Sequence, residues 1–198
     1  MENMLEFIKS RRSTRKYLDK PVEEEKLLQV LEAGRYAPSG GNNQTTHFLV
    51  IQNPQVLADI ADLAKVEFAK MEITPGMYRS MANSIRASKN GPYVFHFHAP
   101  VLIAAANVSS YSNNLVDCAC ALENMMLMAN ALDLGSCWVN QLKWLNENGP
   151  MTEFLQKLGL QDQEKVYGAI VVGYPDTPDG LPNRTPLPRT GNIVTRIP

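Results

Sequence analysis

Apolar residues recur with the spacing of an amphipathic α-helix in several segments of the chain. The clearest segment runs from Val22 to Ala37, where Pro21 precedes the predicted helix and Pro38 ends it. The same spacing predicts a short helix over residues 4–8, a helix over 56–68 and a helix that begins at Pro150 and includes Leu155. The pattern therefore predicts a largely helical chain.

Short apolar runs between these helices predict buried strands. Residues 47–52 form one run, which Asn53 and Pro54 stop. Residues 100–106 contain no polar side chain, and residues 167–173 form a similar run. Residues 135–140 predict a shorter strand after Gly135, where we expect the preceding helix to end.

That preceding segment, residues 115–134, predicts the longest helix, and its apolar residues spread around most of the helix circumference. A helix with this pattern is central or lies at an interface, and in a chain of this size a partner subunit would cover one side. The rival interpretation is a membrane segment, which the acidic residues disfavour. The polar interruptions are Asp117, Glu123, Asn124, Asn130 and Asp133.

Two segments lack clear periodicity. Residues 71–93 are interrupted at 74–76 and again at 89–92, which is typical of a mobile cap or insertion that carries substrate contacts. Residues 174–198 contain six of the 13 prolines and predict an extended arm that ends in a strand-like stretch at 192–195.

Length and charge narrow the function classes. A chain of 198 residues fits a single domain over 1–198, and its net charge of -1 gives no general attraction for nucleic acid. A small anionic ligand suits this balance better than a polyanion does. The N-terminus has no signal-peptide pattern and no apolar run approaches the ~20 residues of a membrane span, which predicts a cytoplasmic protein.

The cysteines and histidines give little sign of a metal site. Cys118, Cys120 and Cys137 are odd in number and lack a C-x-x-C spacing, so we expect reduced core residues and neither a disulfide framework nor a zinc ribbon. His96 and His98 have no third ligand nearby, and we interpret them as residues at the entry to a strand. The sequence therefore predicts no metal.

Three arginines and a hydroxyl lie within five residues after the first helix, in the run Arg11-Arg12-Ser13-Thr14-Arg15. Guanidinium groups match phosphate oxygens bidentately, so the run predicts a phosphate clamp. In an extended segment Arg11, Ser13 and Arg15 would share one side. The alternative is a solvated basic turn.

A second polar stretch, residues 38–44, reads Pro-Ser-Gly-Gly-Asn-Asn-Gln. Its glycines permit close approach of a ligand, and its amides can donate and accept hydrogen bonds at the edge of a heterocycle. The alternative is an ordinary polar loop. Arg184 and Arg189 on the proline-rich arm could return to the arginine run and complete a phosphate site.

Taken in order, these motifs resemble those of the nitroreductase family of FMN-dependent oxidoreductases. The resemblance implies an α+β fold, with a mainly antiparallel central sheet flanked by helices. It also implies an intertwined homodimer that binds two FMN molecules at the subunit interface and whose C-terminal arm reaches the other subunit. The matching motifs are the arginine run, Pro38-Ser39-x-x-Asn42-x-Gln44, Leu134 to Trp138, Gly173-Tyr174-Pro175 and Pro188-Arg189.

The resemblance also implies roles by position. The implied phosphate and ribityl contacts are Arg11, Ser13 and Arg15, with Arg12 adjacent and Arg189, or else Arg184, as a late basic partner. The implied lining of the flavin ring is Pro38, Ser39, Asn42 and Gln44, and the strand whose backbone faces the ring near N5 comprises Ser136, Cys137, Trp138, Val139 and Asn140. The chain departs from the family pattern at Thr45-Thr46, where many relatives have proline and an aromatic residue, and at Asn140, where glycine is common.

The expected function is an FMN-dependent transfer of electrons from NAD(P)H to a nitroaromatic, a quinone or a similar small acceptor by a ping-pong mechanism. The flavin performs the redox chemistry, so we name no catalytic acid or base. One alternative is a non-catalytic or regulatory flavin-binding dimer. Another is a family relative with other flavin chemistry, such as dehydrogenation, dehalogenation or flavin destruction, which residues 71–93 would determine. A module that binds anions or nucleic acid is a third, which the net charge disfavours.

Overall fold

The computed structural model describes residues 3–198 and has an α+β architecture, as predicted. Its elements in chain order are α1 (Met4–Ser10), α2 (Glu24–Arg35), the 3-10 turn η1 (Gly40–Asn42), β1 (His47–Ile51), α3 (Pro54–Ala69), α4 (Arg79–Asn90), β2 (Val101–Val108), α5 (Asn114–Ala131), β3 (Gly135–Val139), α6 (Gln141–Trp144), α7 (Gly149–Lys157) and β4 (Glu164–Gly173).

The four strands form one antiparallel sheet in the order β1-β2-β4-β3. Ala104 is the residue opposite both Leu49 on β1 and Ala169 on β4, so β2 lies in the centre of the sheet. Cys137 on the edge strand β3 faces Val171. The antiparallel sheet predicted from the family resemblance is therefore confirmed.

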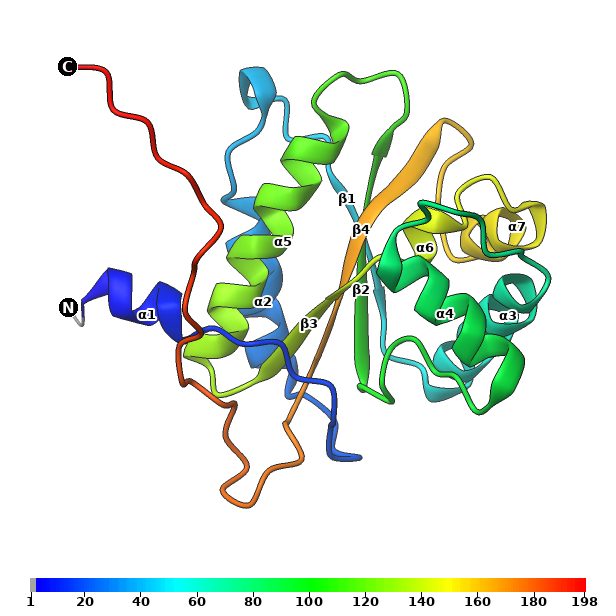
Figure 1. Cartoon of the computed structure of the whole chain (residues 1–198), viewed down its shortest axis with the longest axis horizontal. Coiled ribbons are helices and arrows are strands. Elements are labelled where there is room, and N and C mark those ends of the chain that lie inside the picture. Colours follow the sequence, from blue (N-terminus) through cyan, green and yellow to red (C-terminus); the bar gives the residue numbers. More distant parts are fainter. Residues whose placement is uncertain (1–2) are drawn as a thin grey trace.

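Helices cover both faces of this sheet (Figure 1). The helices α2 and α5 lie on one side, and α3, α4, α6 and α7 lie on the other. Along β2 the side chains alternate between two buried clusters: Ile103 packs with Met125 of α5, whereas Leu102 packs with Phe68 of α3. A strand buried on both faces has no polar side, which explains why the strands appear in the sequence as continuous apolar runs.

The helix α5 ends at Ala131, three residues before its predicted end. Asp133 adopts a left-handed conformation with φ 62°, and the Leu134 amide donates to the Ala129 carbonyl at 2.9 Å. This is the hydrogen bond of a Schellman motif, in which Asp133 occupies the position that glycine usually fills. The prediction that Gly135 ends the helix is wrong, because Gly135 is the first residue of β3.

Residues 71–93 contain a helix, α4, that the periodicity of the sequence did not reveal. Its buried side is composed mostly of small residues: Ala82, Ser84, Ile85 and Ser88. Residues 79–90 are polar on average, and this composition hid the helix although its apolar and polar positions do lie on opposite sides. The single-turn helix α6 was also not predicted, because one turn is too short to establish a period.

His96 and His98 lie in the turn before β2, so they do not share one face of a strand. His96 is buried and His98 is exposed. Within residues 3–198 no group of three potential metal-ligating side chains occurs, and no helix is both long and apolar enough to cross a membrane.

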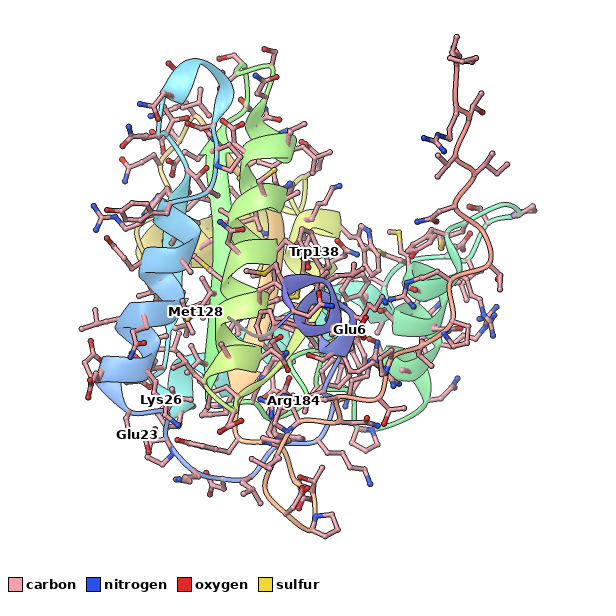
Figure 2. All side chains as sticks on the ribbon, turned by 90° about the vertical axis from the view of Figure 1, so that its left-hand side faces the viewer. Glu6, Glu23, Lys26, Met128, Trp138 and Arg184 are labelled. Atoms are coloured by element: carbon pink, nitrogen blue, oxygen red, sulfur yellow. The ribbon has the colours of Figure 1, made fainter. Side chains whose placement is uncertain are left out.

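The proline-rich arm extends away from the sheet without regular secondary structure, and the strand-like stretch predicted at 192–195 is not a strand. Ile193 is 92% exposed, so in a single chain nothing covers it. The root of the arm is fixed: the Tyr174 hydroxyl donates to Glu23 at 2.5 Å and accepts from Lys26 at 3.0 Å. Glu23 and Lys26 lie together at the lower end of α2 in Figure 2.

Candidate functional site

The arginine run lies directly against the edge strand β3. The Thr14 amide donates to the Ser136 carbonyl at 2.8 Å, and Ser13 forms a parallel bridge with Ser136. Gly135 makes this approach possible, because a Cβ at that position would lie 2.6–2.7 Å from three side-chain atoms of Thr14. The structure thus joins two motifs that are more than 100 residues apart in the sequence.

The side chains of the run alternate as an extended segment requires. Arg12 turns toward the arm, where its Nη1 donates to the Thr185 carbonyl at 2.6 Å. Ser13 and Arg15 are exposed on the other side. The Arg11 side chain is only 20% exposed, and its Nε lies 3.7 Å from a carboxylate oxygen of Glu123.

Arg11, Ser13 and Arg15 all influence the thiol of Cys137 on β3. Burial raises the pKa of that thiol. The charge of Arg15, a polar contact with Ser13 and the charge of Arg11 each act to lower the same pKa. Together with the bridge between Ser13 and Ser136, this influence places the predicted phosphate contacts on the same stretch of β3. The net effect leaves Cys137 a protonated, buried thiol, as expected. Cys118 is buried too, but Cys120 is only half-buried and so is not a core residue.

Arg184 occupies a different place from the arginine run. Its Nη2 donates to the Asn130 carbonyl at 2.6 Å and lies 2.7 Å from the Asp133 carboxylate. A cation suits this position, because the last carbonyls of α5 point toward it. Arg189 is exposed and hydrogen-bonds only to the nearby Leu187 carbonyl. Figure 2 shows Arg184 on the same face of the molecule as Trp138.

The polar stretch 38–44 lies near the opposite end of α5. The Asp117 carboxylate accepts from the Gly40 amide at 3.1 and 3.3 Å and from the Tyr111 hydroxyl at 3.0 Å. Asn42 and Gln44 both have φ 54°, an uncommon conformation for residues with a side chain. A buried carboxylate thus holds a strained loop, a combination that is common at functional sites.

Sequence reasoning missed this anchor. Tyr111 and Asp117 carry no motif, and they lie about 70 residues from the loop that they hold, counting residues along the chain. Asp117 was noted only as a polar interruption of an apolar helix. The sequence offered one signal, an acidic residue on the buried side of an apolar helix. A buried carboxylate requires a hydrogen-bond donor, so such a residue indicates a partner elsewhere in the chain.

The end of β3 is connected to α4 by polar side chains. The Trp138 indole donates to Asn140 Oδ1 at 2.7 Å. The adjacent Gln141 donates to the Tyr93 hydroxyl at 2.8 Å, and Tyr93 donates to Ser84 Oγ at 2.8 Å. The segment 71–93 is therefore fixed next to the predicted flavin-facing strand.

Within one chain, the predicted site residues form two groups. The arginine run and β3 form the first group, and the loop 38–44 forms the second. The loop lies beside Asp117, and the chain just before the run lies beside Asn130, which donates to Ser10, about 20 Å farther along α5 at 1.5 Å per residue. The Arg11 side chain reaches back to Glu123, about 9 Å from Asp117 along the helix axis. Figure 1 shows the light-blue turn of this loop at the top of the molecule and the dark-blue segment after α1, which contains the arginine run, lower down.

The model of the nitroreductase family matches residues 8–174, which include both groups. The chain belongs to the nitroreductase family. The family resemblance read from the motifs is thereby confirmed.

Individual members of the nitroreductase family resemble the chain over almost all of its length. A protein of Archaeoglobus fulgidus named as an NADH dehydrogenase/NAD(P)H nitroreductase is 28% identical over 88% of this chain and 87% of its own. The FMN reductase (NADPH) of Bacillus subtilis is 23% identical over 94% of this chain and 71% of its own. The crystal structure of a nitroreductase with bound FMN from Bacteroides fragilis is 32% identical, with a TM-score of 0.85 over 100% of both chains.

Proposed function

We propose that the protein is an FMN-dependent oxidoreductase that transfers electrons from NAD(P)H to a nitroaromatic, a quinone or a similar small acceptor by a ping-pong mechanism. Membership of the nitroreductase family supports the reaction class, and the related Bacteroides fragilis structure with bound FMN supports the cofactor. The observation that carries the proposal within this chain is the convergence of Arg11, Ser13 and Arg15 beside β3.

The residues beside β3 fit the phosphate and ribityl chain of FMN. Ser13 and Arg15 are exposed, and the contact of Arg11 with Glu123 is long for an ion pair, so their donors are available to an anion. Arg12 is occupied by the arm and is adjacent to the phosphate rather than in contact with it. Arg184 is paired with Asp133, which favours Arg189 as the late basic partner.

The flavin ring would lie along β3 toward Asn140. Bound FMN would supply the redox chemistry, accepting a hydride from NAD(P)H and passing electrons to the acceptor. The chain would supply orientation: the backbone amides of residues 136–140 would hold the ring near N5, and the amides of Asn42 and Gln44 would hold its edge. The connection from Gln141 to Tyr93 supports a role for α4 in contacting the acceptor and limiting the size of acceptor that fits.

The separation of the two groups within one chain supports a homodimer. Because the loop 38–44 and the arginine run lie at different positions along α5 within one chain, we infer that each flavin site takes one group from each subunit. Exposed apolar residues support a covered surface: Met4 and Leu5 of α1 are 63% and 56% exposed, and Ile193 of the arm is 92% exposed. The arm would cross to the other subunit. A cytoplasmic location also stays a prediction.

The first test is the visible spectrum of the purified protein, followed by identification of the released chromophore and anaerobic addition of NADH or NADPH. We expect a yellow protein that releases FMN and loses its absorbance on reduction. Rapid NAD(P)H oxidation with added quinone distinguishes an enzyme from a flavin-binding module. A colourless protein that also fails to take up added FMN would overturn the proposal.

Variants of the arginine run test the assignment of the site. Arg11→Ala and Arg15→Ala should each raise the Kd for FMN by about 10- to 150-fold, since a charge-assisted hydrogen bond contributes roughly 1.5–3 kcal/mol. Arg86→Ala on the exposed side of α4 is the matched control, because Arg86 contacts only Asn83 of its own helix. Unchanged FMN affinity in both variants would refute the assignment of the phosphate contacts.

A further inference from the structure

A cavity of about 700 Å³ lies away from the proposed flavin site. It opens at the edge of the sheet where β1 ends and β2 begins, and the first turns of α3 form one wall. This volume is within the range of sites for small organic molecules. Its lining comprises Tyr17, Asp19, Pro21, Val22 and Gln52, then Pro54, Leu57, Ala58, Ala61 and Asp62 of α3, and residues 94, 96 and 98–101.

The floor of this cavity is apolar and rigid. Val22, Leu57, Ala61, Ala99 and Val101 are all buried, and each is at most 5% exposed. They come from three separate parts of the chain that pack on the sheet, so the floor exists without a ligand. Such a surface suits the hydrocarbon or aromatic body of a small molecule.

The rim of the cavity is acidic. Asp19 and Asp62 are both exposed there, and the lining contains no lysine or arginine. FMN and NAD(P)H carry phosphates, which these carboxylates would repel. The charge of the rim therefore distinguishes this cavity from the proposed flavin site and favours a cation.

His96 and His98 contribute imidazole side chains to the wall of the cavity. His96 is 5% exposed, and its Nδ1 has no hydrogen-bond partner within residues 3–198. Burial lowers the pKa of His96, and the neighbouring His98 lowers it further, so the buried imidazole is neutral at pH 7. Phe97 and His98 have φ 56° and 58°, so the turn that presents them is strained.

We propose that this cavity is a second ligand site, which binds a small organic amine in its cationic form with the apolar body on the floor and the ammonium group at the acidic rim. The buried ring nitrogen of His96 is a further polar atom available to a hydrogen-bond donor if the wall adjusts around the ligand. This proposal does not depend on the proposed function, since no residue assigned to the flavin lines the cavity.

The test uses three probes that share one aromatic body and differ in charge: 2-naphthylmethylamine, 2-naphthylmethanol and 2-naphthoate. Binding to the FMN-loaded full-length protein is measured by isothermal titration calorimetry at pH 7 and low salt. We expect the amine to bind about three- to tenfold more tightly than the alcohol, because two exposed carboxylates contribute modestly. We expect no measurable binding of the carboxylate.

Three variants locate the binding. Ala58→Phe fills the cavity from an exposed position on α3 and should abolish binding of the amine and the alcohol. Asp62→Asn should reduce the preference for the amine and leave binding of the alcohol unchanged. Asp59→Asn is the matched control, because Asp59 lies on the same helix outside the cavity and contacts Gln55. It should bind like the parent protein.

Several outcomes would overturn the proposal. They are equal binding of all three probes, unchanged binding in Ala58→Phe, displacement of FMN by the amine, and absence of binding to protein whose thermal unfolding is normal. The same titrations on protein prepared without flavin separate the two proposals. Amine binding that persists there supports the cavity even if the flavin assignment fails.

Discussion

The close contact between Gly135 and Thr14 gives a direct test of how the arginine run is positioned. In Gly135→Ala the new Cβ would lie 2.6 Å from Thr14 Oγ1 and 2.7 Å from both Cβ and Cγ2 of Thr14. Rotation about χ1 cannot relieve the contact with Thr14 Cβ. The arginine run must therefore move away from β3, which strains the 2.8 Å hydrogen bond from Thr14 to Ser136.

The expected magnitude follows from ordinary contact distances. Non-bonded carbon atoms make favourable contact at about 3.5–4.0 Å, so the arginine run must move by roughly 1 Å. Overpacking of this kind costs about 1–3 kcal/mol. For a chain of this length that corresponds to a fall in Tm of about 2–12 °C, which circular dichroism measures on the flavin-free protein. The displaced arginines should also bind FMN more weakly, which a fluorescence titration measures.

Two further variants make the test selective. Gly149→Ala is the control, because a Cβ there meets no atom within 4 Å. Thr14→Gly removes the three clashing atoms, so the double variant should be less destabilised than the sum of the single variants. An unchanged Tm in Gly135→Ala would contradict the contact itself. A lower Tm with unchanged FMN affinity would contradict the role of the arginine run.

Three other predictions concern buried groups elsewhere in the chain. Hydrogen bonds from Lys70 and from the Asn148 side chain hold the pKa of Glu67 below its usual 4.5. The ionised Glu67 therefore stabilises the fold above pH 4.5, and this contribution is lost as pH falls through the lowered pKa. Urea unfolding between pH 5 and 3 should therefore show a smaller loss of stability in Glu67→Gln than in the parent. Burial raises the pKa of Cys118 to about 12. At pH 8 only about 10⁻⁴ of that thiol is ionised, so mass spectrometry should find Cys118 alkylated by iodoacetamide only after unfolding. Asp117→Ala should release the Gly40 amide and weaken FMN binding by roughly 1.5–3 kcal/mol in a titration, and an unaltered Kd would argue against the loop as a ring contact.

The strands could be predicted from the sequence because their environment is uniform. Helices cover both faces of the sheet, so the positions of β2 are apolar from Val101 to Ala106, and the run itself marks the element up to the buried Asn107. The predicted strands at 47–52 and 100–106 agree with β1 and β2 within two residues at each end. The antiparallel arrangement of the strands was predicted from the family resemblance.

The features that were missed depend on contacts between distant residues or on small side chains. Ala82 and Ser84 lie on the buried side of α4, and neither is apolar enough to mark a buried position in the sequence. Asp133 ends α5 in a conformation that glycine more often adopts, so no sequence signal separated it from Gly135. Tyr111 and Asp117 anchor the loop 38–44 through the fold alone.

The division of the site into two groups makes a final prediction about assembly. A subunit with Arg15→Ala keeps an intact loop, and a subunit with Asp117→Ala keeps an intact arginine run. If each flavin site combines the run of one subunit with the loop of the other, a heterodimer of these variants contains one fully intact site and one doubly defective site.

Each homodimer of the two variants would then bind FMN weakly, and unfolding and refolding the mixture should restore tight sites in the heterodimers. Titration of bound FMN, with the two unmixed variants refolded in parallel, measures the recovery. If both groups of a site came from the same chain, every site in the mixture would carry one defect and mixing would restore none. Such an outcome would contradict the shared site directly, because both groups, which lie at different positions along α5, would then serve one flavin within a single subunit.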